Sequence, residues 1–316
     1  MTAPIAYIAR TRAYYLALGY DNPYVWALRH DVPFMPLDRP LAHTRITLVT
    51  TAAPYQPDKG EQGPGAPYNA RAKFFQVYSG DTRHDHDVRI AHVAIDRQHT
   101  SMEDSGTWFP LPLMRRLAQA GRFRLAPRFH GFPTNRSQRQ TIEVDAPELL
   151  ARCQQEEVRA AVLVANCPVC HQSLALAARH LEANGISTVL MGCARDIVER
   201  CGVPRFLFSD FPLGNAAGRP HDLASQETTL ELALRLLIEA NAPRTTLESP
   251  LIWAEAEDWK QDYANPDRLS AEEFARLREE AEIARIQAKA LRDSALSGEP
   301  DDASSQTSPV CCCAVR

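Results

Sequence analysis

The stretch RAAVLVANCPVCHQSLALAARHLEANGISTVLMG, residues 159–192, decides the fold class. It opens with the continuous apolar run RAAVLVAN, which is typical of a buried strand. The amphipathic segment CHQSLALAARHLEANG then predicts a helix that ends at Asn184-Gly185, and the apolar run ISTVLMG predicts a second buried strand. Two strands joined by a helix over short connections form a βαβ unit, so we expect them to be parallel.

The same alternation continues on both sides of this unit. Upstream, DAPELLARCQQEE predicts a helix with Asp145 as its N-cap and with Pro147 and Glu148 in its first turn. Downstream, ARDIVERCG predicts a short helix, RFLFSD a third strand, and SQETTLELALRLLIEAN a long helix that begins at Ser225. The sequence therefore predicts an α/β fold, with a Rossmann-like parallel sheet and helices on both of its faces.

The two ends of the chain are less regular. TRITLVTTAAP, FFQVYSG and VRIAHVAI are short strand candidates, and a helix is expected from about Leu111. Near the other end, SAEEFARLREEAEIARIQAKALRDSAL starts with the capping box Ser270 and Glu273 and predicts a charged helix. We expect four parts: an N-terminal α/β part with long loops (1–140), an α/β part that bears a Cys-x-x-Cys motif (141–245), a C-terminal helical extension (246–297) and a disordered, Cys-rich tail (298–316).

Composition restricts the classes of function. The formal net charge is −4, so no overall basic field exists to bind nucleic acid. The N-terminus lacks the apolar core of a signal peptide, and no run of apolar residues is long enough to cross a membrane. We therefore expect a cytoplasmic protein that binds neither nucleic acid nor membranes, and a homo-oligomer stays open. In a reducing compartment, its 8 cysteines point to catalysis, redox exchange or metal binding.

The motif Cys167-Pro168-Val169-Cys170-His171 is expected just past the carboxyl end of a buried strand. Open α/β sheets bind ligands at that edge, and a helix N-terminus lowers the pKa of a thiol. Three interpretations stay open from the residues alone: a redox or nucleophilic dithiol, two buried structural thiols, and a zinc site. The zinc site would need Cys193, Cys201 or His171 to complete it, at irregular spacing.

The segment from Val162 to Gly214 also resembles the selenoprotein B family of glycine, sarcosine, betaine and D-proline reductases. Cys167 stands where that family has selenocysteine, and Cys170 matches the cysteine three residues on. Gly185-Ile186 matches the turn into the next strand, and Pro212-Leu213-Gly214 matches a later segment. Two departures are the sulfur in place of selenium and Ser173 in place of a further cysteine. Because a thiol ionises and leaves less readily than a selenol, the loss of selenium weakens the inference of C–N bond cleavage.

The resemblance implies a thiol-dependent reductase. Cys167 would attack an activated small-molecule substrate, Cys170 would resolve the adduct by forming a disulfide, and a thiol donor or a partner redox protein would reduce that disulfide. His171 is a candidate acid for the leaving group, or else an exposed first-turn histidine. We expect no metal and no cofactor beyond dithiol–disulfide exchange, since no dinucleotide-binding glycine motif follows a strand.

Further candidates lie outside the motif. Arg128, His130 and Asn135 stand in a Gly- and Pro-rich segment that is able to bind a substrate carboxylate, and Gly214 and Asn215 are expected to contact the substrate as well. The segment RHDHDVRIAHVAIDRQH, residues 83–99, holds metal-capable side chains, and it could bring His92 or His99 to the cleft.

The tail is the second unusual feature. Cys311, Cys312 and Cys313 are consecutive, and a tethered thiol can act on its own active site at about millimolar effective concentration. Two alternatives to an enzyme therefore stay open. One is a thiophilic-metal-binding protein that uses Cys167, Cys170 and the tail, and the other is a non-catalytic subunit of a reductase complex.

Overall fold

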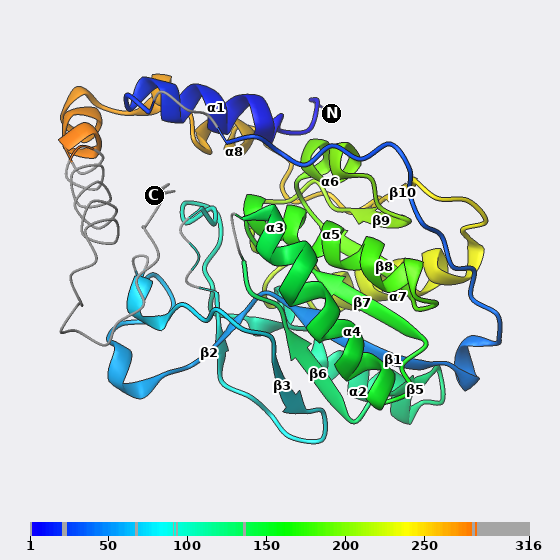
Figure 1. Cartoon of the computed structure of the whole chain (residues 1–316). Coiled ribbons are helices and arrows are strands. Elements are labelled where there is room, and N and C mark those ends of the chain that lie inside the picture. The colour runs from blue at the N-terminus through cyan, green and yellow to red at the C-terminus, as the bar shows by residue number, and fades with distance from the viewer. Residues whose placement is uncertain are drawn as a thin grey trace, which may run out of the picture.

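The computed structural model describes residues 2–20, 24–66, 69–90, 92, 94–134, 137–279 and 282. At its centre is an 8-stranded sheet with the order β10-β9-β8-β7-β1-β6-β3, in which β5 also pairs with β1 (Figure 1). The strands are β1 (Arg45–Thr50), β3 (Tyr78–Asp81), β5 (Arg124–Leu125), β6 (Arg128–Gly131), β7 (Ala160–Val164), β8 (Ser187–Gly192), β9 (Arg205–Phe208) and β10 (Thr245–Glu248). All pairs are parallel except β3 with β6. The expected α/β class with a mostly parallel sheet is confirmed. A separate short ribbon pairs β2 (Ala53–Pro54) with β4 (Val88–Arg89).

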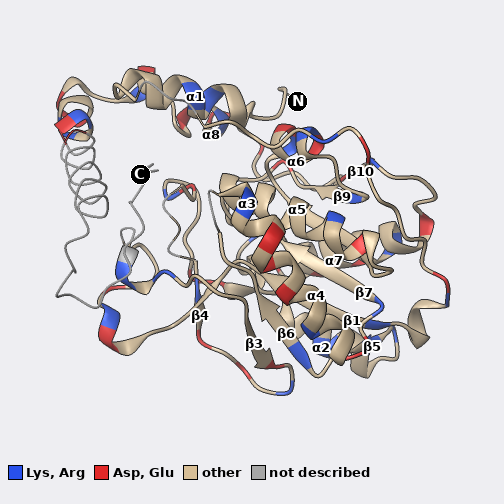
Figure 2. Cartoon of the chain, in the orientation of Figure 1, with Lys and Arg blue, Asp and Glu red and all other residues tan. Residues whose placement is uncertain are grey.

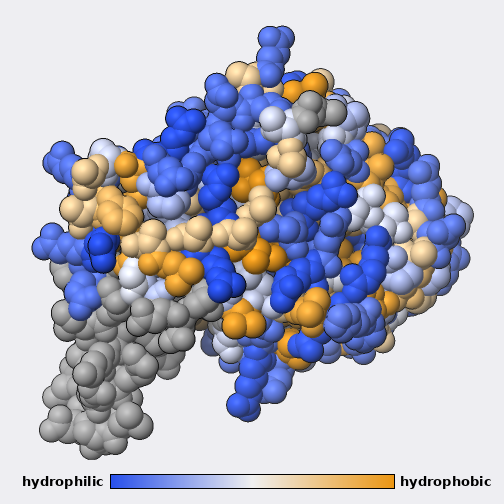
Figure 3. Space-filling model, turned by 90° about the horizontal axis from the view of Figure 1, so that it is seen from above, coloured by the Kyte–Doolittle hydropathy of each residue, from blue (hydrophilic) through white to orange (hydrophobic). Residues whose placement is uncertain are grey.

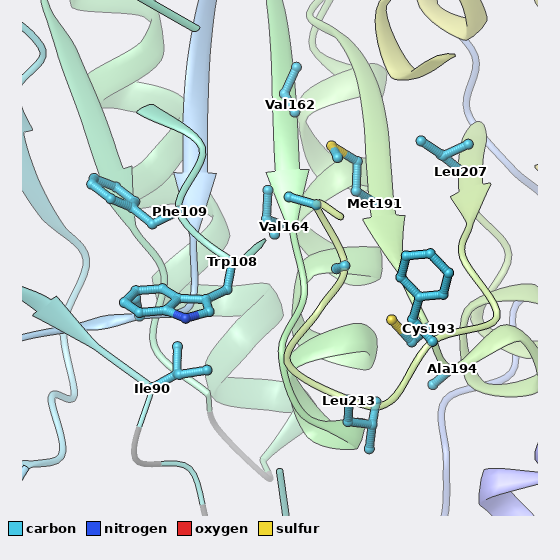
Figure 4. Close-up of a cluster of buried hydrophobic side chains, with 14 of the residues drawn as sticks. Ile90, Trp108, Phe109, Val162, Val164, Met191, Cys193, Ala194, Leu207 and Leu213 are labelled. Carbon is cyan, nitrogen blue, oxygen red and sulfur yellow. The ribbon is translucent and has the colours of Figure 1, made fainter. Parts of the chain in front are cut away.

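Helices cover both faces of this sheet because its strands are apolar on both sides. In β7, Val162 and Val164 pack in one cluster with α2 (Leu111–Gln119) and α7 (Leu223–Glu239). Leu163 and its neighbour Ala161 pack in the other cluster, with α4 (Ala146–Gln155) and α5 (Pro168–Ala183). Figure 4 shows the first of these clusters, where Val164 lies between Trp108 and Met191.

Two neighbouring strands at the centre of the sheet carry no charge. β7 and β8 contain no charged residue, and Figure 2 shows blue and red mainly on helices and loops. Seen from above, the surface mixes apolar and hydrophilic residues (Figure 3). In the part of the chain that the structure describes, no helix has both the length and the apolar character to cross a membrane.

The N-terminal part of the described chain lies over α6 (Arg195–Cys201), where the Ile8 N–H donates to Asp196. The N-terminal helix α1 (Tyr7–Ala17) packs beside α8 (Trp259–Asp262), as Figure 1 shows. The rings of Tyr7 and Tyr263 meet with their centroids 5.2 Å apart, and Tyr263 donates to the carbonyl of Ala94. These contacts place α1 and the residue that follows α8 close to Ala94.

Several expected boundaries are wrong. The apolar run 88–95 pairs as a strand only over Val88–Arg89, because Ile90 and Ile95 are buried from a loop instead. The chain is already helical from Gln138, through a π-helical turn at Thr141–Asp145, so the Asp145 side chain does not cap α4. The long helix begins at Leu223 rather than Ser225, because the Asp222 side chain accepts the Ser225 N–H and caps it.

The remaining segments bear on the expected division of the chain. β1, from the expected first part, lies between β6 and β7, so one sheet continues across position 140. Residues 271–279 are helical, as expected for the start of the charged helix. Residues 283–316, including most of that helix and the tail, lie outside the described residues, and the four-part division stays a prediction.

A buried ion pair ties the N-terminal segment to the sheet. Arg205 on β9 donates to Glu182 of α5 at 2.7 Å, and both side chains are fully buried. Arg205 also donates to the carbonyl of Met35 at 2.8 Å and stacks on Phe34, 4.3 Å from the ring centroid. The Glu182 carboxylate accepts further hydrogen bonds from Thr188 and from the Met35 N–H. Every contact of the carboxylate is therefore to a donor.

Candidate redox site

The Cys-x-x-Cys motif lies at the carboxyl edge of the parallel sheet, as the sequence predicts. β7 ends at Val164, and Cys167 is the N-cap of α5, with Pro168 at the first helical position. The extended backbone of Cys167 (φ −120°, ψ 169°) turns its side chain back over the helix start. Its sulfur accepts the Cys170 N–H at 3.3 Å. An N–H of the first helical turn, which has no acceptor within the helix, thus points at the sulfur of Cys167. This arrangement stabilises a thiolate.

The two sulfurs are close and reduced. Cys167 Sγ and Cys170 Sγ are 2.8 Å apart, and the cysteines of the described chain are free thiols. A disulfide bond is about 2.05 Å long, so its formation needs only a small movement. Cys167 is 5% exposed and Cys170 is fully buried. Access from outside therefore favours Cys167 as the sulfur that meets another molecule.

The surroundings of the sulfurs favour a shared negative charge. Burial alone would raise the pKa of Cys170, but hydrogen bonds from Cys167, His92 and Thr51, together with the charge of His92, lower it well below the usual value. Arg97 lies close enough to Cys167 for their charges to attract. Because the sulfurs are in contact, the lowered pKa belongs to the pair as a unit. One proton shared between two sulfurs is the state that these groups stabilise.

His171 is fully buried, so the alternative of an exposed first-turn histidine is wrong. Nδ1 lies 2.7 Å from the Cys167 carbonyl, and Nε2 accepts the N–H groups of Cys193 and Ala194 at 2.8 and 3.1 Å. Burial lowers the pKa of His171 to about 4, although the Cys167 carbonyl and the charge of Cys170 oppose the shift. The neutral ring joins the β7–α5 turn to the β8–α6 turn, and these bonds occupy both nitrogens. This arrangement favours a positioning role for His171 over proton donation.

The packing of His171 depends on a glycine at the end of β8. A Cβ atom at Gly192 would lie 2.6 Å from Cδ2 and Nε2 of the His171 ring. We expect Gly192→Ala to reduce the free energy of unfolding by about 1–3 kcal/mol, because the ring must move and lose its hydrogen bonds. Denaturant unfolding measures this loss. The matched control is Gly63→Ala, whose Cβ meets no atom within 4 Å; equal stability of the two variants would contradict the assignment.

The structure separates the other expected site residues. Arg128 starts β6, is exposed, and lies near Glu156 at the opposite end of the sheet from Cys167. His130 is buried, with its Nδ1 2.9 Å from the Ser79 hydroxyl. Burial, followed by the charges of Arg152 and Arg128, lowers the pKa of His130 to about 4. Asn135 and the tail cysteines lie outside the described residues.

Gly214 and Asn215 belong to a buried loop near the end of β8. Asn215 donates to the Thr100 hydroxyl at 2.8 Å, and Gly214 has a φ of +109° that favours glycine. A Cβ there would also meet Ile95 and Thr100. The N–H of Asn215 points to the buried thiol of Cys193, whose pKa is raised, chiefly by burial. Cys193 is thus kept protonated, unlike the cysteine pair that follows the neighbouring strand β7.

Three site residues come from the segments around β1 and the loop after β4. Thr51 directly follows β1, and its hydroxyl accepts from Asn166 at 2.9 Å as well as contacting Cys170. Arg97 donates to the carbonyl of His92 at 2.8 Å, which ties the Arg97 side chain to the backbone of His92. Sequence reasoning considered His92 but missed Thr51 and Arg97. The only available signal was that Thr51 follows a predicted strand, since the carboxyl ends of parallel strands share one edge.

The structure also separates the metal-capable side chains of residues 83–99 from one another. His84 and Asp85 lie on an exposed turn, and His99 is held between Asp96 and Asp262 at 3.2 and 3.3 Å. Hydrogen bonding to Asp96 raises the pKa of His99 despite its burial. Only His92 of this segment joins the cysteines: its ring and the sulfurs of Cys167 and Cys170 offer ligand atoms within 4.8 Å of one another.

The fold and site together define an α/β protein with a buried dithiol at the carboxyl edge of a parallel sheet. Comparison with known proteins adds a specific likeness: the chain is similar to D-proline reductase subunit gamma of Acetoanaerobium sticklandii, with 29% identity over 207 residues. The match covers 65% of this chain and 82% of the relative. It supports a relationship to the proline and glycine reductases in general, rather than to selenoprotein B in particular. No family model and no solved structure matches the chain.

Proposed function

We propose that this chain is the dithiol-bearing subunit of a reductase, in which Cys167 attacks the substrate and Cys170 resolves the adduct. The observation that carries this proposal is the pair of free thiols 2.8 Å apart at the end of β7. The similarity to a subunit of D-proline reductase supports the reaction class and the presence of partner subunits. D-proline, or a related small amino acid, is the substrate that we propose on the same ground.

The proposed reaction balances as two displacements. In the first, the Cys167 thiolate forms an S–C bond to the substrate, and the C–N bond breaks with its electron pair on nitrogen, which takes up a proton. In the second, Cys170 attacks the sulfur of Cys167, the carbon leaves with the electron pair and takes up a proton, and a disulfide forms. The substrate gains two electrons and the dithiol loses two. A dithiol of a partner redox protein or of the thiol pool then reduces the disulfide.

The described residues have separate roles in this scheme. Arg97 would stabilise the anionic form of Cys167, and His92 and Thr51, which both contact Cys170, would assist the resolving step. His171 would hold the turn that carries Cys167. Arg128 lies at the opposite end of the sheet from Cys167 and is left out of the proposed site. Substrate contacts by His130, Asn135, Gly214 and Asn215, electron transfer by Cys311–Cys313, and a cytoplasmic location stay part of the proposal.

Oxidation of the full chain tests the dithiol directly. After equilibration of the reduced chain with oxidised glutathione, acid quenching, alkylation and peptide mapping should find a Cys167–Cys170 disulfide that excess dithiothreitol reverses. The variant with Cys311, Cys312 and Cys313 replaced by serine should form the same bond. Oxidation confined to the tail, with Cys167 and Cys170 still reduced, would contradict the proposal.

A further inference from the structure

His92 adds a third thiophilic ligand to the cysteine pair. One ligand atom each from His92, Cys167 and Cys170 lies within 4.8 Å of the other two, and the residues come from two segments far apart in the sequence. In the part of the chain that the structure describes, no group hydrogen-bonds to the buried Nδ1 of His92. One imidazole and two sulfurs are a donor set that Zn²⁺ and Cu⁺ prefer over hard cations.

The three donors are also oriented by neighbours. Cys167 Sγ accepts the Cys170 N–H at 3.3 Å, and the Thr51 hydroxyl, itself hydrogen-bonded to Asn166 at 2.9 Å, contacts Cys170. Outer hydrogen bonds of this kind fix ligand positions and tune metal affinity. In tetrahedral zinc sites with Zn–S bonds of about 2.3 Å, the two sulfurs stand about 3.8 Å apart. The present 2.8 Å separation would therefore have to widen by about 1 Å.

We propose that His92, Cys167 and Cys170 form a three-ligand site for a thiophilic cation such as Zn²⁺, with a fourth position left for water or another small ligand. Two thiolates neutralise a divalent cation, so the occupied site carries no net charge beside the nearby guanidinium of Arg97. This inference gives the metal-binding alternative a third ligand within the fold, and it does not require the tail cysteines.

Metal binding and the redox cycle would exclude each other. Both sulfurs of the occupied site are bonded to the cation, so neither is free to attack a substrate or to form the disulfide. Zn²⁺ would therefore protect the dithiol from oxidation and inhibit a reductase that uses it. Removal of the metal by a chelator would restore the free pair.

The test is a titration of the reduced full chain with Zn²⁺ in competition with a chromophoric chelator, and with Co²⁺ as a spectroscopic substitute. The chain should carry the replacements Cys311→Ser, Cys312→Ser and Cys313→Ser, so that tail thiols do not contribute. We expect one ion per chain, a thiolate-to-cobalt charge-transfer band, and protection of both site cysteines from alkylation. His92→Ala should weaken binding at least about a hundredfold but keep the band. The matched control, His84→Ala on the exposed turn, should bind as the parent does.

Two results would overturn the inference: binding well below one ion per chain, or equal affinity of the parent, His92→Ala and Cys167→Ser chains. The outcome is also distinguishable from failure of the proposed function. Stoichiometric Zn²⁺ without disulfide formation under oxidised glutathione would reject the reductase and keep the metal site. Reversible disulfide formation without Zn²⁺ binding would do the opposite.

Discussion

Replacing Cys167 by serine should reduce D-proline turnover at least about a thousandfold in the complex purified on this chain, because the attacking sulfur is lost. Cys170→Ser should also stop turnover, but after the first displacement, since nothing then resolves the adduct. Intact-mass analysis should therefore find substrate bound to Cys167 in the Cys170→Ser variant only. The structure supports this asymmetry, because Cys167 is 5% exposed whereas Cys170 is fully buried.

Cys153→Ala is the control for these variants. Cys153 is also a buried free thiol, but it lies in α4, away from the carboxyl edge of the sheet, and burial raises its pKa to about 12. Turnover should stay within about twofold of the parent, since no reacting atom is changed. An adduct on Cys170 in the Cys167→Ser variant would reverse the assigned roles of the two sulfurs.

Arg205→Met should reduce the free energy of unfolding by about 3–5 kcal/mol at pH 8, because it leaves Glu182 buried without its cation, either as an unpaired charge or at the cost of taking up a proton. Guanidinium denaturation measures the loss. The double variant Glu182→Gln with Arg205→Met should recover part of it, since no charge is then buried. Arg139→Met is the surface control: its exposed pair with Glu143 should contribute less than about 1 kcal/mol.

The effect of Arg205→Met should also depend on pH. Burial raises the pKa of Glu182 to about 7, and the charge of Arg205 opposes this shift, so its removal should raise the pKa further. A carboxyl whose pKa is raised by folding loses stability as pH rises from its unfolded pKa to its folded pKa. Above pH 7, Glu182 is still protonated in the folded variant but no longer in the folded parent, so only the variant continues to lose stability. The variant's deficit in free energy of unfolding should therefore be smaller near pH 5 and grow above pH 7. A constant deficit from pH 5 to pH 9 would contradict this account.

The strands β7, β8 and β9 could be predicted because each is a continuous apolar run next to a short connection and a helix. The run 88–95 looked equally apolar, yet most of it is loop. Its apolar side chains, such as Ile90 and Ile95, are buried by tertiary packing rather than by pairing in a sheet. A local run of apolar residues indicates that a segment is buried, but it does not indicate which element packs against it.

The candidate site likewise contains residues that the local sequence predicts and residues that only tertiary packing brings together. Cys167 and Cys170 are three residues apart, and their place between a strand and a helix could be inferred locally. Thr51 and Arg97 reach the sulfurs only because β1 lies beside β7 and the loop after β4 passes over the sheet edge. For His171 the sequence placed the residue correctly at the helix start. Its burial depends on Gly192 at the end of the neighbouring strand, which no local pattern shows.

The most direct test of the central claim is a single turnover without external thiol. The reduced complex is mixed with D-proline and quenched in acid, and the reduced product and the Cys167–Cys170 disulfide are then counted in the same sample. The account predicts one disulfide for each molecule of product, because the dithiol supplies both electrons. Product formed while Cys167 and Cys170 remain reduced would contradict it.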